Sequence, residues 1–320
     1  MKIVHLDTFT ATMDGLGLTP FDGFEDFVHY KNTSPDKVIK RAKDADILIT
    51  NKVEVDESAI DQLPNLKYIC VCASGYNNVD IKAAKKRGIP VSNVSGYSTN
   101  SVVQHVFSLA LHALINVAYY DEEVMDGRWQ ETGQFTFYDH SIRELNGMTL
   151  GIYGYGTIGH KIANVANAFG MNIIVTKRNV PVNNLDNVEY VDFETLIAKS
   201  DILTLHSSLN PSNEGIMNKG VFQKMKPTSV LINTARGGLI NEADLAVALN
   251  NDELSFACLD VLSQEPPQHN NPLLNAKNCI ITPHIAWTSL EARKKLLAGV
   301  ANNIKAFINH EPLLNVVNNL

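Results

Sequence analysis

Short runs of β-branched and other apolar residues alternate with helical patterns along nearly the whole chain, and this alternation constrains the fold more than any other feature. Each apolar run has the length of one buried strand, and the helical pattern between two runs has the length of a crossover helix. Such βαβ units build parallel sheets with helices on both faces. The sequence therefore predicts an α/β protein made of doubly wound parallel sheets.

The predicted strands fall into two series, and this division indicates two domains. A chain of 320 residues is about twice as long as a typical domain, so it can bury two cores. The strands are Lys2–Leu6, Asp46–Thr50, Tyr68–Cys72 and Ile89–Ser92 in the first series, and Thr149–Tyr153, Ile173–Thr176, Asp201–Leu205, Ser229–Asn233, Phe256–Asp260 and Cys279–Thr282 in the second.

The last helical pattern, Leu290–His310, follows the final strand of the second series and has no strand of that series left to cover. We therefore expect it to pack back on the first domain. The first domain is then discontinuous, with residues 1–97 plus 288–320, and residues 98–287 form the inserted second domain. The polypeptide would then pass twice from one domain to the other, and these two connections would form a hinge beside a cleft.

Composition and charge exclude several classes of protein. With 45% apolar and 19% charged residues, the sequence is that of an ordinary globular protein and not of a disordered one. Lys and Arg number 27 against 34 Asp and Glu, and this net charge of −7 disfavours nucleic acid as a partner. The four cysteines are too few and too scattered for a disulfide framework, which suits a cytoplasmic protein.

The hydropathy pattern indicates neither export nor a membrane span. Lys2 and Asp7 introduce charge before an apolar region of signal-peptide length can form. The most apolar stretch, Val102–Tyr120, is interrupted by polar residues that include Gln104 and His105. We expect this stretch to be a buried helix.

The most informative local motif is a glycine-rich turn between a predicted strand and a predicted helix, Gly154-Tyr155-Gly156-Thr157-Ile158-Gly159. In this context the first Gly allows a tight turn, the second lets the backbone approach a pyrophosphate, and the third lets the helix pack closely on the strand. The helix N-terminus also attracts negative charge. A purely structural turn is the alternative, and the flanking strand and helix disfavour it. The motif predicts that the chain binds a nicotinamide dinucleotide.

The end of the next predicted strand indicates which nicotinamide cofactor is used, because an Asp or Glu there usually holds the ribose 2′-hydroxyl of NAD. This chain has Lys177 and Arg178 in that region instead. A guanidinium fork pairs well with a 2′-phosphate, and an ammonium group adds a second positive charge. We therefore favour NADP(H). The alternative is that both cations are solvated and that NAD(H) is held through other contacts.

Three reactive side chains, Arg236, Glu265 and His284, each follow a different predicted strand of the second series. Ligands bind outside the carboxyl ends of strands in open α/β sheets, so we expect the three to converge near the glycine motif. Taken singly, they have structural alternatives: a surface cation, a solvated carboxylate and a hydrogen-bonded core histidine. Together they supply a cation for a substrate carboxylate and carbonyl, and a histidine acid whose protonated form a carboxylate stabilises. This set predicts carbonyl reduction, with the hydride carried by the cofactor.

These motifs, taken in order, resemble those of the D-isomer-specific 2-hydroxyacid dehydrogenase family, and the resemblance covers nearly the whole chain. Besides the glycine motif it rests on Asn233–Gly238, Leu259–Pro266 and Thr282–Trp287. The pair Ala286-Trp287 is similar to the glycerate dehydrogenase, or hydroxypyruvate reductase, subgroup. The resemblance implies a Rossmann NAD(P)-binding domain inserted into a discontinuous, flavodoxin-like substrate-binding domain. It also implies a small 2-oxo or 2-hydroxy acid as the substrate.

The resemblance further implies a role for each matching residue. His284, paired with Glu265, would be the acid and base, and Arg236 would bind the carboxylate and carbonyl of the substrate. The other substrate-binding residues would be Lys52, Ser74 and Gly75. The cofactor-binding residues would be Thr99, Val103, Gly154, Tyr155, Gly156, Thr157, Ile158, Gly159, Lys177, Arg178, His206, Thr234, Ala235, Arg236, Asp260, His284 and Ala286.

The segment Gly127–Asn146 resembles the dimerisation arm of the family, which predicts a homodimer. Within the family, Glu265 argues against a formate dehydrogenase, in which a Gln stands beside the histidine. A phosphoglycerate dehydrogenase or another 2-oxo-acid reductase is an alternative, although no additional basic cluster for a substrate phosphate stands out in the first domain.

Other classes of protein have less support. A corepressor-like protein that senses the dinucleotide is the alternative that is not an enzyme, but the sequence has no evident peptide-binding surface or long disordered tail. The sequence contains no HExxH pattern and no G-x-S-x-G pattern. We therefore expect neither a catalytic metal nor a serine nucleophile.

Overall fold

A computed structural model describes residues 1–176 and 188–320. In it the chain divides into two units, one formed by Met1–Ser98 with Thr288–Leu320 and the other by Thr99–Trp287. Lys177 and Arg178, which we predicted to bind the cofactor, lie outside the described residues.

The first unit is built on a five-stranded sheet with the strand order β2-β1-β3-β4-β5, in which every neighbouring pair is parallel. This is the flavodoxin-like order that the resemblance implied. One edge strand, β2, was not predicted, because three residues with an aromatic at one end carry no clear periodicity. The strands are β1 (Ile3–His5), β2 (Phe27–His29), β3 (Ile47–Thr50), β4 (Tyr68–Val71) and β5 (Val91–Ser92).

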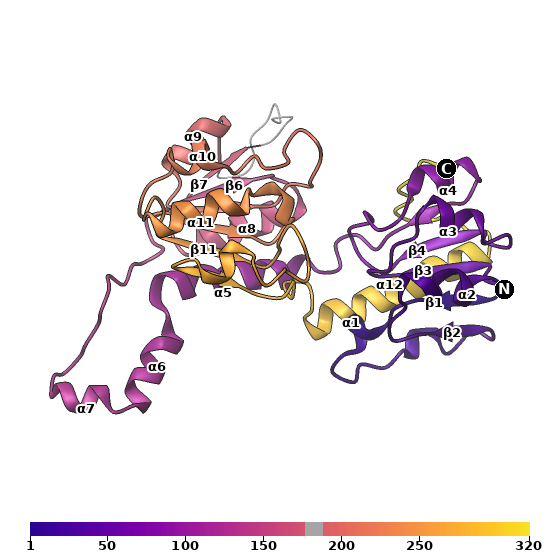
Figure 1. Cartoon of the computed structure of the whole chain (residues 1–320), viewed down its shortest axis with the longest axis horizontal. Coiled ribbons are helices and arrows are strands. Elements are labelled where there is room, and N and C mark those ends of the chain that lie inside the picture. The colour runs from indigo at the N-terminus through magenta and orange to yellow at the C-terminus, as the bar shows by residue number, and fades with distance from the viewer. Residues whose placement is uncertain (177–187) are drawn as a thin grey trace. The chain divides into compact units, whose positions relative to one another are not determined.

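Helices cover both faces of this sheet (Figure 1). Short helices α2, α3 and α4 contribute residues such as Val38, Ile60 and Ala84 to the core on one face. The long C-terminal helix α12 contacts β4, where the rings of Tyr68 and Phe307 stack with their centroids 4.6 Å apart. The helices of this unit are α1 (Phe9–Thr12), α2 (Val38–Ala42), α3 (Glu57–Asp61), α4 (Ile81–Lys86) and α12 (Leu290–Ile308), with 3-10 turns η1 (Thr19–Phe21) and η2 (Pro35–Lys37).

The second unit is built on a seven-stranded sheet with the order β12-β11-β10-β9-β6-β7-β8, again parallel throughout. The order reverses between β6 and β9, and this switch point is where a Rossmann sheet binds its ligand. The six predicted strands are present, and the two-residue edge strand β8 is an addition that is too short to show a pattern. The strands are β6 (Thr149–Tyr153), β7 (Asn172–Thr176), β8 (Glu189–Tyr190), β9 (Ile202–Leu205), β10 (Val230–Asn233), β11 (Phe256–Leu259) and β12 (Cys279–Ile281).

Two separate apolar clusters lie on the two faces of this sheet. One cluster contains Val106 and Phe107 of α5 and Ile162 of α8. The other contains residues of α9, α10 and α11, such as Leu196, Phe222 and Leu245. The helices are α5 (Thr99–Ile115), α8 (Thr157–Ala168), α9 (Phe193–Lys199), α10 (Lys219–Phe222) and α11 (Glu242–Asn250), with 3-10 turns η3 (Gly237–Leu239) and η4 (Pro272–Asn275).

Two further helices, α6 (Val117–Met125) and α7 (Arg128–Thr132), and residues 133–139 after them form an arm that projects from the body of the second unit (Figure 1). Arg128 stabilises the arm from within. It donates hydrogen bonds to both carboxylate oxygens of Asp139, at 2.7 and 2.5 Å, and to Glu123 at 2.6 Å. Among the described residues no single helix has the length and apolarity of a membrane span, and α5 with α6 meets that test only as a pair bent by 53°.

Candidate active site

The glycine-rich turn after β6 has the backbone geometry that we predicted from its sequence. Gly154 has φ +100°, and a Cβ on it would lie 2.7 Å from the backbone carbonyl carbon of His206. A Cβ on Gly159 would lie 2.8 Å from the carbonyl oxygen of Gly154, whereas one on Gly156 would meet no atom within 4 Å. The first and third glycines are thus required by the fold, and the second leaves open space above the N-terminus of α8.

A cavity of about 540 Å³ lies at this turn, between the carboxyl ends of β6, β7 and β9. Its lining includes Gly154, Gly156 and His206, which we predicted to bind the cofactor, and Thr176, which we did not. Tyr155 is only 3% exposed, and its ring stacks on the ring of His160.

Polar groups just after β9 and β10, at the same edge of the sheet, fit a bound dinucleotide. In the part of the chain that the structure describes, the buried Oγ1 atom of Thr234 has no hydrogen-bond partner. Such an atom is costly unless a ligand or a water satisfies it. Burial lowers the pKa of His206 to about 3, so its ring is neutral at pH 7. Its Nε2 atom lies 2.7 Å from the hydroxyl of Thr204. Together with the open space at Gly156, these features fit a cofactor whose pyrophosphate is held by the turn.

His284 and Glu265 form a pair at the same edge of the sheet, after β12 and β11 respectively. The Nδ1 atom of His284 lies 2.6 Å from Oε2 of Glu265. The other carboxylate oxygen, Oε1, accepts the N–H of Leu262 at 3.0 Å, which fixes the orientation of the carboxylate. The two side chains are 26% and 37% exposed, so the pair is accessible to a small ligand.

Arg236 lies directly after β10, on a turn that is held by the last residue of the strand. Asn233 donates through Nδ2 to the carbonyl oxygen of Arg236 at 2.9 Å and accepts the N–H of Ala235 at 3.0 Å. A Cβ on Gly237 would lie 1.9 Å from the backbone carbonyl carbon of Leu262. The loops after β10 and β11 are therefore in direct backbone contact, and this contact brings the segments that carry Arg236 and Glu265 together.

Asp260 is buried below the His284 turn, and sequence reasoning missed two of its partners. Thr282 donates through its hydroxyl to Asp260 Oδ1 at 2.6 Å, and Nε2 of His105 lies 3.4 Å from the same oxygen. Burial alone would raise the pKa of Asp260, but the hydrogen bonds it accepts outweigh this effect and lower the pKa. The sequence shows His105 only as a polar residue within an apolar helix, with no signal that it contacts a loop far along the chain.

The predicted cofactor residues Thr99, Val103 and Ala286 are all buried, at 7%, 7% and 3% exposure. Val103 and Ala286 belong to the apolar cluster that α5 shares with the sheet. Thr157 and Ile158 form the first turn of α8, directly after the glycine-rich turn.

The remaining predicted substrate residues, Lys52, Ser74 and Gly75, belong to the first unit and follow β3 and β4. Lys52 sits on a turn held by Asp7, whose carboxylate accepts the backbone N–H groups of Asn51, Lys52 and Val53 at 2.8, 2.5 and 3.0 Å. Burial raises the pKa of Asp7 against the opposing effect of these hydrogen bonds. Ser74 donates through Oγ to the carbonyl oxygen of Val94 at 3.0 Å. Sequence reasoning did not identify Asp7, because its partners lie more than 40 residues away.

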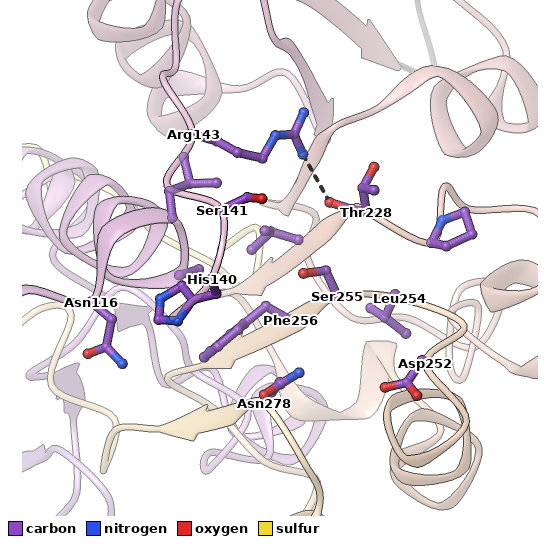
Figure 2. A pocket seen from close by; sticks show the side chains of 14 residues that line it. Asn116, His140, Ser141, Arg143, Thr228, Asp252, Leu254, Ser255, Phe256 and Asn278 are labelled. Carbon is purple, nitrogen blue, oxygen red and sulfur yellow. Dashed lines mark hydrogen bonds between the residues drawn. The ribbon is translucent and has the colours of Figure 1, made fainter. Parts of the chain in front are cut away.

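A second cavity, of about 530 Å³, lies at the opposite edge of the second unit's sheet, where β10 and β11 begin (Figure 2). His140 and Arg143 line it from the segment that returns from the arm, and Phe256 and Asn278 line it from the sheet. Arg143 donates to the carbonyl oxygen of Thr228 at 3.4 Å. None of the predicted catalytic residues line this cavity. It lies at the base of the arm, away from the sheet edge that carries His284 and Glu265.

The second unit therefore has the sheet order, the phosphate turn and the histidine–carboxylate pair of a nicotinamide-dependent oxidoreductase. The sequence model of the D-isomer specific 2-hydroxyacid dehydrogenase, NAD binding domain, matches residues 107–286. The chain belongs to the D-isomer-specific 2-hydroxyacid dehydrogenase family and is an oxidoreductase.

Individual relatives support the same assignment over the full length. The chain is 40% identical to a hydroxypyruvate reductase from Blautia hydrogenotrophica over 99% of this chain and 100% of the relative. It is 37% identical to a glycerate dehydrogenase from Methylorubrum extorquens over 97% of both chains. Among solved structures it is similar to an acyclic imino acid reductase in complex with NADPH and D-Arg, with a TM-score of 0.86, 30% identity and coverage of 99% and 100%.

Proposed function

We propose that this D-2-hydroxyacid dehydrogenase acts as a glycerate dehydrogenase, or hydroxypyruvate reductase, that also takes glyoxylate. The proposal rests mainly on the 2.6 Å contact between Nδ1 of His284 and Oε2 of Glu265. This pair lies at the same edge of the sheet as Arg236. The names of the two relatives described above, a hydroxypyruvate reductase and a glycerate dehydrogenase, support the substrate class.

His284 is the acid of the proposed reduction. Because Nδ1 is engaged by Glu265, the proton that reaches the substrate oxygen leaves from Nε2. Glu265 keeps the ring in one orientation, with Nε2 left to face the substrate. In the oxidative direction the same pair accepts the proton from the substrate hydroxyl.

Arg236 binds the carboxylate of the substrate and polarises its carbonyl group. The planar guanidinium suits a carboxylate because it donates two parallel hydrogen bonds. Lys52 and the backbone N–H groups around Ser74 and Gly75, on the first unit, are proposed to hold the same carboxylate.

The glycine-rich turn, Gly154 to Gly159, holds the pyrophosphate of the cofactor. When bound, the reduced nicotinamide cofactor supplies the hydride that adds to the carbonyl carbon of the substrate. Thr99 and Val103 are proposed to lie near the nicotinamide. The other residues proposed to bind the cofactor outside the glycine-rich turn are His206, Thr234, Ala235, Arg236, Asp260, His284 and Ala286. The unpartnered Oγ1 of Thr234 supports a ligand at this place.

We further propose a preference for NADP(H), with Arg178 and Lys177 pairing with the ribose 2′-phosphate. The support is the sequence itself, which has two cations where NAD-binding members usually have a carboxylate. The structural relative that was solved with NADPH is consistent with this choice.

The chain is proposed to act as a homodimer in the cytoplasm. The arm carries large apolar side chains that are well exposed, with Trp129 at 47%, Phe135 at 94% and Tyr138 at 68%, and such side chains favour burial against a partner. All four cysteines are free, which supports a reducing compartment.

A rate assay tests the substrate and the cofactor together. Hydroxypyruvate, glyoxylate, pyruvate and phosphohydroxypyruvate are each offered with NADPH and with NADH, and oxidation of the reduced cofactor is followed by absorbance. The proposal predicts the highest kcat/KM with hydroxypyruvate and NADPH. A preference for the phosphorylated substrate would identify a phosphoglycerate dehydrogenase instead, and an equal or higher kcat/KM with NADH would remove the proposed cofactor preference.

A further inference from the structure

Asp260 is the main binding partner of the turn that carries His284. Three consecutive backbone N–H groups bind it: that of His284 donates to the carbonyl oxygen of Asp260 at 2.9 Å, and those of Ile285 and Ala286 donate to Oδ1 and Oδ2 at 2.8 and 2.9 Å. His284 has φ +55°, in the left-handed region that residues other than glycine seldom adopt. Such a conformation persists only where the surroundings impose it.

His105 of helix α5 contacts two residues of this arrangement, Thr282 and Asp260. Its Nε2 atom lies 3.1 Å from Oγ1 of Thr282, two residues before His284, and 3.4 Å from Oδ1 of Asp260. The hydroxyl of Thr282 gives its one proton to Asp260 at 2.6 Å, so towards His105 it acts as an acceptor. Nε2 of His105 therefore carries a proton and donates it to this pair of oxygens.

The same face of α5 contacts the other end of the turn. Ser101, four residues before His105, donates through its hydroxyl to the carbonyl oxygen of Ala286 at 2.6 Å. Residues four apart on a helix lie one above the other. The first turns of α5 thus hold both ends of the segment from Thr282 to Ala286.

We infer that His105 is a positioning residue for the reaction: by binding Thr282 and Asp260 it keeps the turn, and with it the ring of His284, in the geometry needed for proton transfer. This inference rests on the proposed role of His284. His105 acts through other residues, since it contacts Thr282 and Asp260 and not the His284 ring. Its side chain is 17% exposed, so the imidazole is held within the packed helix and is not a solvated surface group.

The test compares His105→Ala, which removes the donor, with His105→Gln, whose side-chain amide nitrogen can occupy the place of Nε2. His105→Ala is expected to lower kcat for hydroxypyruvate by about 10- to 100-fold, because a misplacement on the order of 1 Å costs about that much in rate. The Kd for the cofactor, measured by fluorescence titration, should change less than about twofold, because the phosphate turn is untouched. His105→Gln should recover most of the lost kcat.

A matched control and a coupled variant make the test specific. Ser108→Ala alters an exposed residue of the same helix and should leave kcat unchanged. Thr282→Val removes the hydroxyl between His105 and Asp260. When Thr282→Val is already present, adding His105→Ala should lower kcat by less than about twofold further. The reason is that the effects of substitutions at two residues of one hydrogen-bond network are not additive.

Hydrogen exchange separates this inference from the proposed function, because it needs no substrate. The backbone amides of residues 284–286 should exchange faster in His105→Ala than in the wild type, and Ser108→Ala should match the wild type. Exchange that is the same in His105→Ala as in the wild type would overturn the inference. So would a His105→Gln variant whose kcat is no higher than that of His105→Ala. If exchange is faster in His105→Ala but the wild-type chain reduces no 2-oxo acid, the contact is upheld and only the proposed function is overturned.

Discussion

The Nδ1 atom of His284 and the Oε2 atom of Glu265 lie 2.6 Å apart, and Oε1 of the same carboxylate accepts the backbone N–H of Leu262 at 3.0 Å. A carboxylate fixed in this way determines which ring nitrogen of the histidine faces a substrate. The pair sits on loops after two adjacent strands, so the sheet itself sets the distance between them.

Arg236→Lys keeps the positive charge but loses the planar fork of donors. We expect kcat/KM for hydroxypyruvate to fall by about 100-fold, since each charge-assisted hydrogen bond contributes about 1.5–3 kcal/mol. The KM for the oxo acid should rise at least about ten times more than the KM for the cofactor. Arg143→Lys, the same substitution at the opposite edge of the sheet, is the control. Equal effects of the two substitutions would refute the assigned role.

The double variant Lys177→Ser/Arg178→Ser removes the two cations proposed to bind the 2′-phosphate. The kcat/KM with NADPH should fall by about 10- to 100-fold, while the value with NADH stays within about twofold, because only NADPH carries the extra phosphate. Steady-state kinetics with both cofactors measure this. Lys199→Ser, at the end of α9, serves as the control, and a parallel loss with both cofactors would contradict the assignment.

The arm is proposed to join two copies of the chain. In light scattering, the wild type should have twice the mass of the 35.3 kDa chain. Phe135→Asp, which places a charge on the most exposed aromatic of the arm, should yield a monomer. Val247→Asp alters an exposed apolar residue of α11 and should leave the dimer intact. A monomeric wild type, or a dimeric Phe135→Asp variant, would contradict the proposal.

We predict that His5 makes the stability of the fold depend on pH. It is fully buried on β1, and burial, with a smaller effect from His29, lowers its pKa to about 3. The unfolded chain binds the proton at an ordinary pKa of about 6.5, so the stabilisation by neutral His5 is complete above that pH and is lost as the pH falls towards 3. Between pH 7 and pH 5 the loss should be about 2 kcal/mol of unfolding free energy.

Denaturant titrations of wild type and His5→Leu at pH 7 and pH 5 measure this contribution. From pH 7 to pH 5 the unfolding free energy of His5→Leu should fall less than that of the wild type. This comparison does not depend on how stable the variant is at pH 7. His269→Leu, which alters an exposed histidine, should follow the wild type. An identical pH dependence in His5→Leu and the wild type would show that His5 is not the responsible group.

Much of the fold was predictable because its strands are buried on both faces and read as apolar runs. β3 and β4 are fully buried tetrapeptides, whereas the edge strands β2 and β8 are short and partly exposed, so they carry no such pattern. The placement of Arg236, Glu265 and His284 at one edge of the sheet followed from their places after the parallel strands β10, β11 and β12.

Other features of the site were not predictable, because they depend on contacts between distant parts of the chain. His105 meets Thr282 across 177 residues, and Asp7 meets Lys52 across 45. Neither residue stands in a local motif. The positive φ of His284 likewise has no signal in the sequence, because the turn is bound by Asp260, which lies 24 residues earlier in the chain.

The central claim, that His284 with Glu265 transfers the proton in 2-oxo-acid reduction, is tested most directly by the kcat of hydroxypyruvate reduction in wild type, His284→Gln and Glu265→Gln. General acid catalysis contributes about 10²- to 10⁴-fold. We therefore predict a loss of kcat within that range for His284→Gln and a smaller loss of about 10- to 100-fold for Glu265→Gln. In both variants the Kd of the cofactor should change far less than kcat, because the glycine-rich turn is untouched. An inert wild type, or a His284→Gln variant within about threefold of an active wild type, would contradict the account.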